Sequence, residues 1–285
     1  MIVITGATGQ LGGAIVRSLL QRAPGARIAA SVRNPEQAGA LAQLGVEVRR
    51  GDFSRPETLV AAFSGATQVL VVSSNAGAFG ADPVAQHRAA IDAAKQAGAQ
   101  RILYTSHVAA SAWSSFSPMH THAATERILA ESGVRWTSLR NGFYAASALV
   151  FIGDGLEKGR IAVPDDGKVV WTTHADLADA AAAVVLDEGC DGPIPLTGGE
   201  GLDMADIARI ASEVLGRNIE RESISDAALE ERLKALGVPP PRADILLGFY
   251  RASRAGEFAR VDGTLEKLIG RKPQSMRSVL ERLPA

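Results

Sequence analysis

The chain has 285 residues, of which 46% are hydrophobic and 21% charged, and its formal net charge at pH 7 is −1. This composition is typical of a folded globular protein and excludes an intrinsically disordered chain. The Lys and Arg residues are scattered and nearly balanced by acidic residues, so we expect no nucleic-acid partner.

Cysteine content and hydropathy exclude further classes. Cys190 is the single cysteine, which rules out an internal disulfide and a thiolate zinc cluster, and we expect no metal site. The chain starts without a signal-peptide pattern and contains no apolar run of the roughly 18 residues that a membrane-spanning helix needs. We therefore expect a cytoplasmic protein without a membrane partner. The sequence leaves open whether it is a monomer or a homodimer.

Short β-branched or apolar runs alternate with Ala-rich segments of helical period through the first half. The runs are IVIT, ARIAASV, VEVRR, QVLVV, RILYT and VRWTSL. The segments between them predict helices over residues 11–20, 35–44, 56–63, 83–97 and 119–131, several of which start with proline. Such alternation predicts right-handed βαβ units and therefore an α/β fold, a doubly wound parallel sheet of the Rossmann type.

A glycine-rich turn directly follows the first expected strand, in the stretch IVITGATGQLGGAIV. Its glycines permit a tight turn and a close backbone approach to a ligand, and the helix that follows presents free N–H groups. We interpret the turn as a pyrophosphate-binding loop of a dinucleotide site; the alternative is a tight turn with a purely structural role. The expected contacts are Gly6, Thr8, Gly9, Gln10, Leu11 and Gly12.

The end of the second expected strand indicates which nucleotide is bound. An acidic residue there would bind the ribose hydroxyls of NAD, whereas an arginine accommodates the 2′-phosphate of NADP. The sequence ASVRNPE offers Arg33 and no acid at the strand end. It therefore favours NADP(H), and the alternative for Arg33 is a surface residue that ends a strand.

Two further turns add expected cofactor contacts. After the third strand, the GDF stretch places Asp52 and Phe53 where an adenine could be bonded and flanked. After the fourth strand, Ser73, Ser74 and Asn75 are small polar residues that can lie beside a cofactor. Both turns fall at the carboxyl ends of parallel strands, where open α/β sheets bind their ligands.

The second half has a different pattern. Glycines and Pro164 break the chain beyond residue 139, and further helices are expected at 175–186, 204–215, 226–236 and 263–269, with an apolar patch near 245–250 and one more buried strand at 193–199. We assign residues 1–145 to an NADP-binding Rossmann core, to which 171–198 return. Residues 146–170 and 199–285 form a smaller, mostly helical substrate lobe over the carboxyl ends of the strands.

Several motifs spread along the chain resemble one known family. They are TGATGQLG, VRNPE, GDF, YTS at 104–106, HTHAATE at 120–126, LRNGFY at 139–144 and HADLADAAA at 174–182. Together they resemble the NmrA-like branch of the atypical short-chain dehydrogenase/reductases, which contains NADPH-dependent quinone reductases and triphenylmethane reductase. The resemblance implies NADPH in the first loop, an acceptor pocket between the lobes, and Asn141, Gly142, Phe143 and Tyr144 along the nicotinamide side of the cleft.

The sequence also departs from the wider superfamily. Its typical members carry Tyr and Lys four residues apart on the helix after strand five, where the Lys lowers the Tyr pKa from its usual value of about 10. The matching positions here are Pro118 and His122. The usual proton donor is therefore missing.

His120 and His122 on the same predicted helix are candidates to replace the missing Tyr and Lys. On a helix, residues two apart point about 200° apart, so His120 and His122 cannot easily share a metal ion. The resemblance implies that His122 contacts the nicotinamide ribose, with Glu126 one turn away as an orienting partner; a structural histidine is the alternative. His120 either approaches the acceptor or caps the helix. We take both histidines as catalytic candidates.

Three other residues are weaker candidates for the active site. Ser106 falls near the active-site serine of the superfamily, and His107 follows it at the strand-five end, where an ordinary loop histidine is an equal explanation. His174 opens a helix, and capping explains it adequately.

The missing donor decides which reaction we expect. An NADPH-dependent reductase without a strong acid suits a quinone-like or otherwise delocalised acceptor, whose reduced anion can collect a proton from solvent or a histidine. Phe143, Tyr144, Phe151 and Trp113 are candidates to line a flat acceptor pocket. The alternative is a non-catalytic NADP(H)-sensing regulator that binds a partner protein. The missing Tyr and Lys also argue against a third hypothesis, a nucleotide-sugar epimerase or ketone dehydrogenase.

Overall fold

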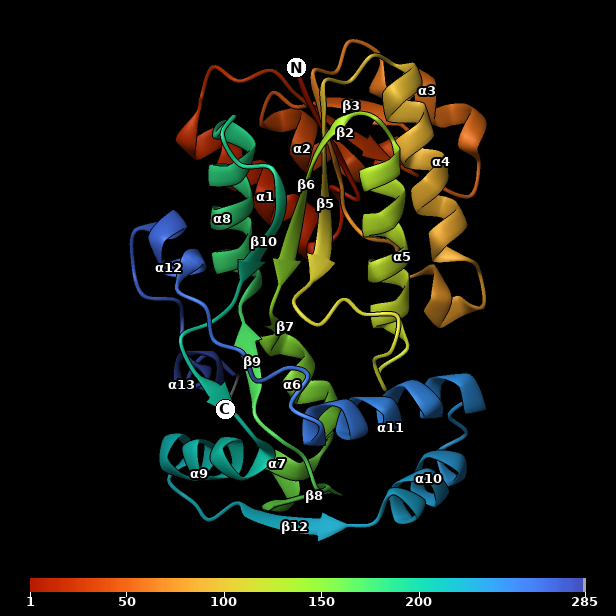
Figure 1. The fold of residues 1–285 in the computed structure, drawn as a ribbon. Helices are drawn as coiled ribbons and strands as arrows, with labels where there is room; N and C mark the ends of the chain where they lie inside the picture. Colours follow the sequence, from red (N-terminus) through yellow and green to blue (C-terminus); the bar gives the residue numbers. More distant parts are fainter. Residues whose placement is uncertain (284–285) are drawn as a thin grey trace.

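The computed structural model describes residues 1–283. Its centre is a seven-stranded sheet in the order β10–β6–β5–β4–β1–β2–β3, with every pairing parallel (Figure 1). The order reverses beside β1, because β2 lies on one side of it and β4 on the other. This is the point at which doubly wound sheets bind ligands, and the predicted α/β fold is confirmed.

The strands of this sheet match the predicted apolar runs. Their bounds are β1 Ile2–Thr5, β2 Ile28–Val32, β3 Glu47–Arg50, β4 Gln68–Val71, β5 Arg101–His107, β6 Arg135–Asn141 and β10 Gly192–Leu196. The predicted strand at 193–199 is thus shorter, and it forms an edge of the sheet instead of a fully buried strand. Its Pro193 and Pro195 are tolerated there because an edge strand needs backbone donors on one side only.

Helices cover both faces of the sheet (Figure 1). On one face lie α1 Gln10–Arg22 and α8 His174–Leu186, and on the other α3 Leu59–Phe63, α4 Pro83–Gln96 and α5 Pro118–Glu131. Helix α1 forms because Leu11, Ile15 and Leu19 recur at helical spacing and are buried against the sheet. The other connections hold η1 Pro35–Ala38, α2 Gly39–Gln43, η2 Pro56–Thr58 and η3 Ala76–Phe79.

A smaller group of elements lies beyond the carboxyl ends of the strands (Figure 1). Its helices are α6 Ala145–Ile152, α7 Gly155–Lys158, α9 Met204–Leu215, α10 Asp226–Ala235, α11 Pro240–Arg254 and α13 Met276–Leu280, while α12 Thr264–Ile269 packs against α8 and β10. Two small sheets complete it, β11–β9–β7 (Gly201–Leu202, Val169–Thr172, Phe143–Tyr144) and β12–β8 (Glu220–Ile224, Arg160–Pro164). Strands β8 and β9 lie where the glycines and Pro164 had indicated breaks in the chain.

Aromatic side chains form the core of this smaller group. The ring centroid of Phe143 lies within 6 Å of those of five Phe and Trp rings, from Phe116, Phe151, Trp171, Phe249 and Phe258. The expected flat acceptor pocket is therefore wrong for Phe143 and Phe151, which pack in this core. It is also wrong for Trp113, which is 93% exposed.

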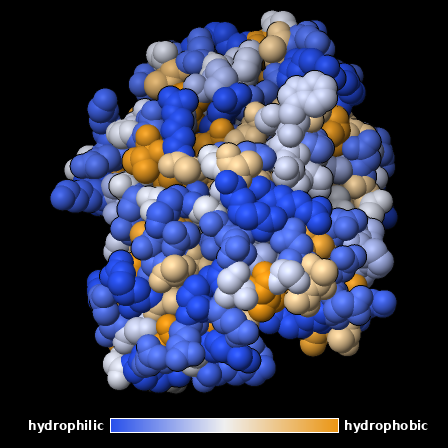
Figure 2. Space-filling view, turned by 60° about the horizontal axis from the view of Figure 1, so that its bottom comes forward, coloured by the Kyte–Doolittle hydropathy of each residue, from blue (hydrophilic) through white to orange (hydrophobic). Residues whose placement is uncertain are grey.

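The outer surface at this end of the molecule is mainly hydrophilic. Figure 2 shows polar side chains over most of this face, with apolar atoms in small scattered groups. Within residues 1–283, no helix combines the length and the apolar character needed to cross a bilayer.

Candidate functional site

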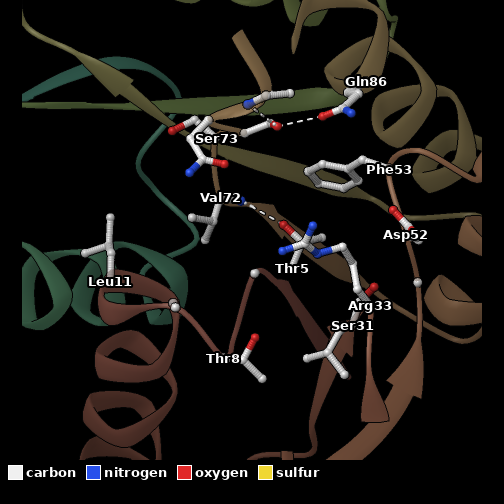
Figure 3. A pocket seen from close by; sticks show the side chains of 18 of the residues that line it. Thr5, Thr8, Leu11, Ser31, Arg33, Asp52, Phe53, Val72, Ser73 and Gln86 are labelled. Atoms are coloured by element: carbon white, nitrogen blue, oxygen red, sulfur yellow. Dashed lines mark hydrogen bonds between the residues drawn. The ribbon is translucent and has the colours of Figure 1, made fainter. Parts of the chain in front are cut away.

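A pocket of about 940 Å³ opens at the carboxyl ends of β1, β2 and β4 (Figure 3). Most of the cofactor contacts predicted from the sequence line it. They are Gly6, Thr8, Gly9, Gln10, Leu11, Gly12, Arg33, Asp52, Phe53, Ser73, Ser74, Asn75 and Tyr144. The structure thus brings together residues from the turns after four strands.

The glycine turn forms one wall of the pocket. Gly6 has a φ of +59°, a left-handed conformation that favours glycine, and a Cβ on Gly12 would collide with the carbonyl oxygen of Gly6. Gly9 is the N-cap of α1 and makes no side-chain cap, so the first N–H groups of the helix are left for a ligand. Thr5 connects this turn to the end of the neighbouring strand β4, because its hydroxyl accepts the N–H of Val72 at 2.9 Å.

Arg33 lies at the rim of the pocket, directly after β2. Its side chain is exposed, and Figure 3 shows it reaching into the same part of the pocket as Phe53. Ser31, which no sequence motif indicated, also lines this part, and its buried hydroxyl has no hydrogen-bond partner within residues 1–283. A cation and a free hydroxyl group at this position suit a phosphorylated ribose.

The turn after β4 is held from behind by a buried histidine. The N–H of Ser74 donates to Nε2 of His87 at 2.8 Å, and Nδ1 of His87 lies 2.9 Å from the Thr125 hydroxyl. Because that hydroxyl donates to the carbonyl of Thr121, Nδ1 of His87 carries the ring proton. Burial lowers the pKa of His87 to about 3, so the ring is neutral at pH 7.

His122 lies outside the residues that line this pocket. Its Nδ1 is 2.9 Å from the hydroxyl of Tyr104 on β5, and its ring stacks against His107 with centroids 6.2 Å apart. Burial lowers the pKa of His122 to about 4. His120 and His122 have different partners, as their spacing predicts. Nε2 of the exposed His120 lies 2.8 Å from the carbonyl of Ser114 in the preceding loop, and His120 neither lines the pocket nor caps α5.

Glu126 does not orient His122, and this expectation is wrong. The carboxylate accepts hydrogen bonds from Arg140 at 2.6 and 3.0 Å, from Ser138 at 2.6 Å and from Ser106 at 2.8 Å. These donors hold the pKa of Glu126 below its usual range even though burial opposes them. Ser106 is therefore engaged with Glu126 and is not presented as a catalytic hydroxyl.

The segment 141–144 contributes one residue to the pocket. Tyr144 lines it together with His174, and their ring centroids are 4.4 Å apart. Asn141, Gly142 and Phe143 lie behind Tyr144 and are buried; a Cβ on Gly142 would collide with the Thr172 hydroxyl.

The interpretation of His174 as a cap is wrong. Thr173 caps α8 by accepting the N–H of Asp176, which leaves the His174 ring at the pocket wall. Within residues 1–283, no cluster of His, Cys, Asp and Glu side chains is placed to hold a metal ion.

The chain is similar to known proteins over almost its whole length. The profile of the family described as NmrA-like matches residues 1–278. Quinone oxidoreductase 2 of Escherichia coli (strain K12) is 37% identical, over 95% of this chain and 94% of that protein.

Two solved structures are similar along almost the entire chain. An NADPH-dependent quinone oxidoreductase from Escherichia coli, complexed with NADPH, has a TM-score of 0.92 at 35% identity and covers 98% of both chains. Triphenylmethane reductase from Citrobacter sp., complexed with NADP(H), has a TM-score of 0.89 at 34% identity and covers 99% of both chains.

Proposed function

The chain belongs to the NmrA-like family, and from this premise we propose that it reduces quinones or other delocalised electrophiles with NADPH as the reductant. It is an NADPH-dependent oxidoreductase. The observation that supports the proposal most directly is Arg33 at the rim of a glycine-built cradle. A cation stands where a 2′-phosphate would lie, and β2 ends without a carboxylate that would repel it.

The residues of the pocket fit this cofactor in three parts. We assign the pyrophosphate to the turn Gly6–Gly12, where the glycines allow the backbone N–H groups to approach it. The adenine end is assigned to Arg33, Asp52 and Phe53, and the middle to the polar turn 73–75. Tyr144 and His174 form the wall at the remaining end.

The protein supplies orientation and a neutral environment, while bound NADPH supplies the hydride. His122 is neutral at pH 7 because burial lowers its pKa to about 4, and burial raises the pKa of Tyr104 above its usual range. Pro118 occupies the position of the usual tyrosine. These side chains do not form a strong acid near neutrality.

The acceptor follows from this lack of a strong acid. A simple ketone becomes an alkoxide on reduction and needs a well-placed acid, whereas a reduced quinone delocalises its charge and takes its proton from water. We therefore assign the protein to quinone-like acceptors, with His122 as a residue that positions ligands.

Steady-state NADPH oxidation with two acceptor classes tests this function. Benzoquinone and menadione should be reduced, and cyclohexanone and acetone should be nearly inert under identical conditions. Preferential turnover of the ketones would contradict the proposal. Inertness towards every acceptor despite tight NADPH binding would favour an NADP(H)-sensing regulator.

A further inference from the structure

His107 and His122 lie against each other at the carboxyl end of β5. Their ring centroids are 6.2 Å apart and the ring planes differ by 29°. His107 ends the strand and is 8% exposed, whereas His122 on α5 stays partly open to solvent. The rings of Phe143 and Phe258 border His107 edge-on, at 5.3 and 5.7 Å. The two imidazoles therefore occupy an aromatic, largely apolar setting.

The partners of the two Nδ1 atoms determine where the ring protons lie. Nδ1 of His107 accepts the backbone N–H of Ala109 at 3.1 Å, so its ring proton is on Nε2. Nδ1 of His122 lies 2.9 Å from the Tyr104 hydroxyl. A phenol is a good donor and an imidazole nitrogen a good acceptor, so Tyr104 donates to His122. Each histidine then presents an Nε2–H group.

The Nε2–H group of His107 is both buried and unpaired. Nε2 of His107 is buried and makes no hydrogen bond within residues 1–283. Buried donors are nearly always paired, because an unpaired one costs stability without return. His107 does not line the cofactor pocket itself, but its strand is tied to it, since Thr105, two positions earlier on β5, accepts the N–H of the pocket residue Ser73 at 2.8 Å. An unpaired donor in this place indicates a ligand.

We propose that His107 and His122 form a two-donor site for the carbonyl oxygen of the electron acceptor, with Tyr104 as the positioning residue of His122. The inference rests on the proposed function. A quinone that gains a hydride carries negative charge on oxygen, which fixed N–H donors stabilise. The quinone takes its hydride from NADPH and its proton from water, so neither histidine changes its protonation state during turnover.

Substitution of His107 separates this role from a structural one. His107→Leu removes the unpaired donor, so we expect kcat/KM for benzoquinone to fall at least about tenfold. The Kd for NADPH should not change. The urea midpoint of unfolding should stay near the wild-type value, because the variant removes the unpaired Nε2–H, and the Ala109 N–H that loses its acceptor is only half-buried and can bind water. His107→Gln is the matched control, since its amide restores an N–H near Nε2 and should retain most of the activity. Wild-type kcat/KM in His107→Leu, or a joint loss of stability, NADPH affinity and activity, would overturn the proposal.

The ring tautomers can be measured without turnover. In ¹⁵N-histidine NMR spectra, Nδ1 should be unprotonated and Nε2 protonated in both His107 and His122, with signals assigned from the His107→Gln and His122→Gln variants. Tyr104→Phe should release the His122 tautomer and lower kcat/KM, but it should have no further effect in a His122→Gln background. A proton on Nδ1 of either wild-type ring would refute the donor pair. Failure of the wild type with every quinone would count against the proposed function instead.

Discussion

His87 holds the backbone of Ser74 in place beside the pocket, through a hydrogen bond of 2.8 Å from the Ser74 N–H to Nε2. The same ring reaches α5 through Nδ1, 2.9 Å from the Thr125 hydroxyl. His87 itself is fully buried on α4. One side chain therefore fixes the turn after β4 relative to two helices.

Loss of this ring should weaken both folding and cofactor binding. His87→Leu leaves the Ser74 N–H without its acceptor, and we expect a loss of about 1–3 kcal/mol in the free energy of unfolding. The Kd for NADPH should rise, because the turn 73–75 loses its support. Urea unfolding and nucleotide titration measure the two effects. His87→Gln offers a carbonyl oxygen near the Nε2 position and should recover part of both; an unaltered Kd in His87→Leu would contradict the role.

Arg33 should set the preference between nucleotides. Arg33→Ala removes the cation expected at the 2′-phosphate, so the affinity for NADPH should fall to that for NADH, while the affinity for NADH changes little. Fluorescence titration of both nucleotides measures this. Arg22→Ala, an exposed substitution at the far end of α1, is the control and should leave the preference intact. Equal affinities of the wild type for both nucleotides would refute the assignment.

Gly12 should tolerate no side chain. In Gly12→Ala the new Cβ would collide with the carbonyl oxygen of Gly6, so the turn must move and binding of both nucleotides should be lost. Gly25→Ala adds the same methyl group where nothing lies within 4 Å and should bind normally. Circular dichroism verifies that both variants fold. Normal affinity in a folded Gly12→Ala variant would show that the turn does not carry the phosphate.

Acidification should destabilise the protein below the ordinary histidine pKa of about 6.5. Burial lowers the pKa of His87 and His107 to about 3 and that of His122 to about 4. Between these values and 6.5 the unfolded chain binds protons that the folded chain does not, so each ring removes about 1.4 kcal/mol of stability per pH unit. Above pH 6.5 the three rings have no effect.

One carboxyl group acts in the opposite direction. Burial raises the pKa of Asp166 to about 6, so the folded state gains a proton first and is stabilised as the pH falls towards the usual value. The net slope remains destabilising because three histidines oppose it. Urea midpoints at pH 7.5, 6 and 5 measure the slope, and His107→Leu should flatten it by the share of one histidine. A flat profile would show that these rings are protonated in the folded protein.

The sequence predicted the central sheet because each of its strands is a compact apolar run between turn residues. The strands of the two small sheets were not predicted, because they are short and pair with segments that are distant in the sequence. Strand β8, for example, pairs with β12, which lies beyond two helices and three other strands in the chain. No local pattern in Arg160–Pro164 distinguishes such a strand from a loop.

In the candidate site, too, local motifs could be predicted and contacts between distant segments could not. The turn Gly6–Gly12 is a local motif and could be recognised from spacing alone. Tyr104 and His87 could not, because each is a buried residue of a regular element whose partner comes from another one. The position of His174 could have been predicted. Thr173 directly precedes it and is a better N-cap residue, so the His174 side chain is free to line the pocket.

The two prolines of β10 also affect whether copies of the protein can associate through their sheet edges. Pro193 and Pro195 lack N–H groups, so the free edge of this strand offers few donors to a strand from another molecule. The opposite edge is β3, which carries Glu47, Arg49 and Arg50. Both ends of the sheet thus resist edge-to-edge pairing, which protects a chain of parallel strands against aggregation while it folds. We therefore do not expect a homodimer to continue the central sheet from one subunit into the other.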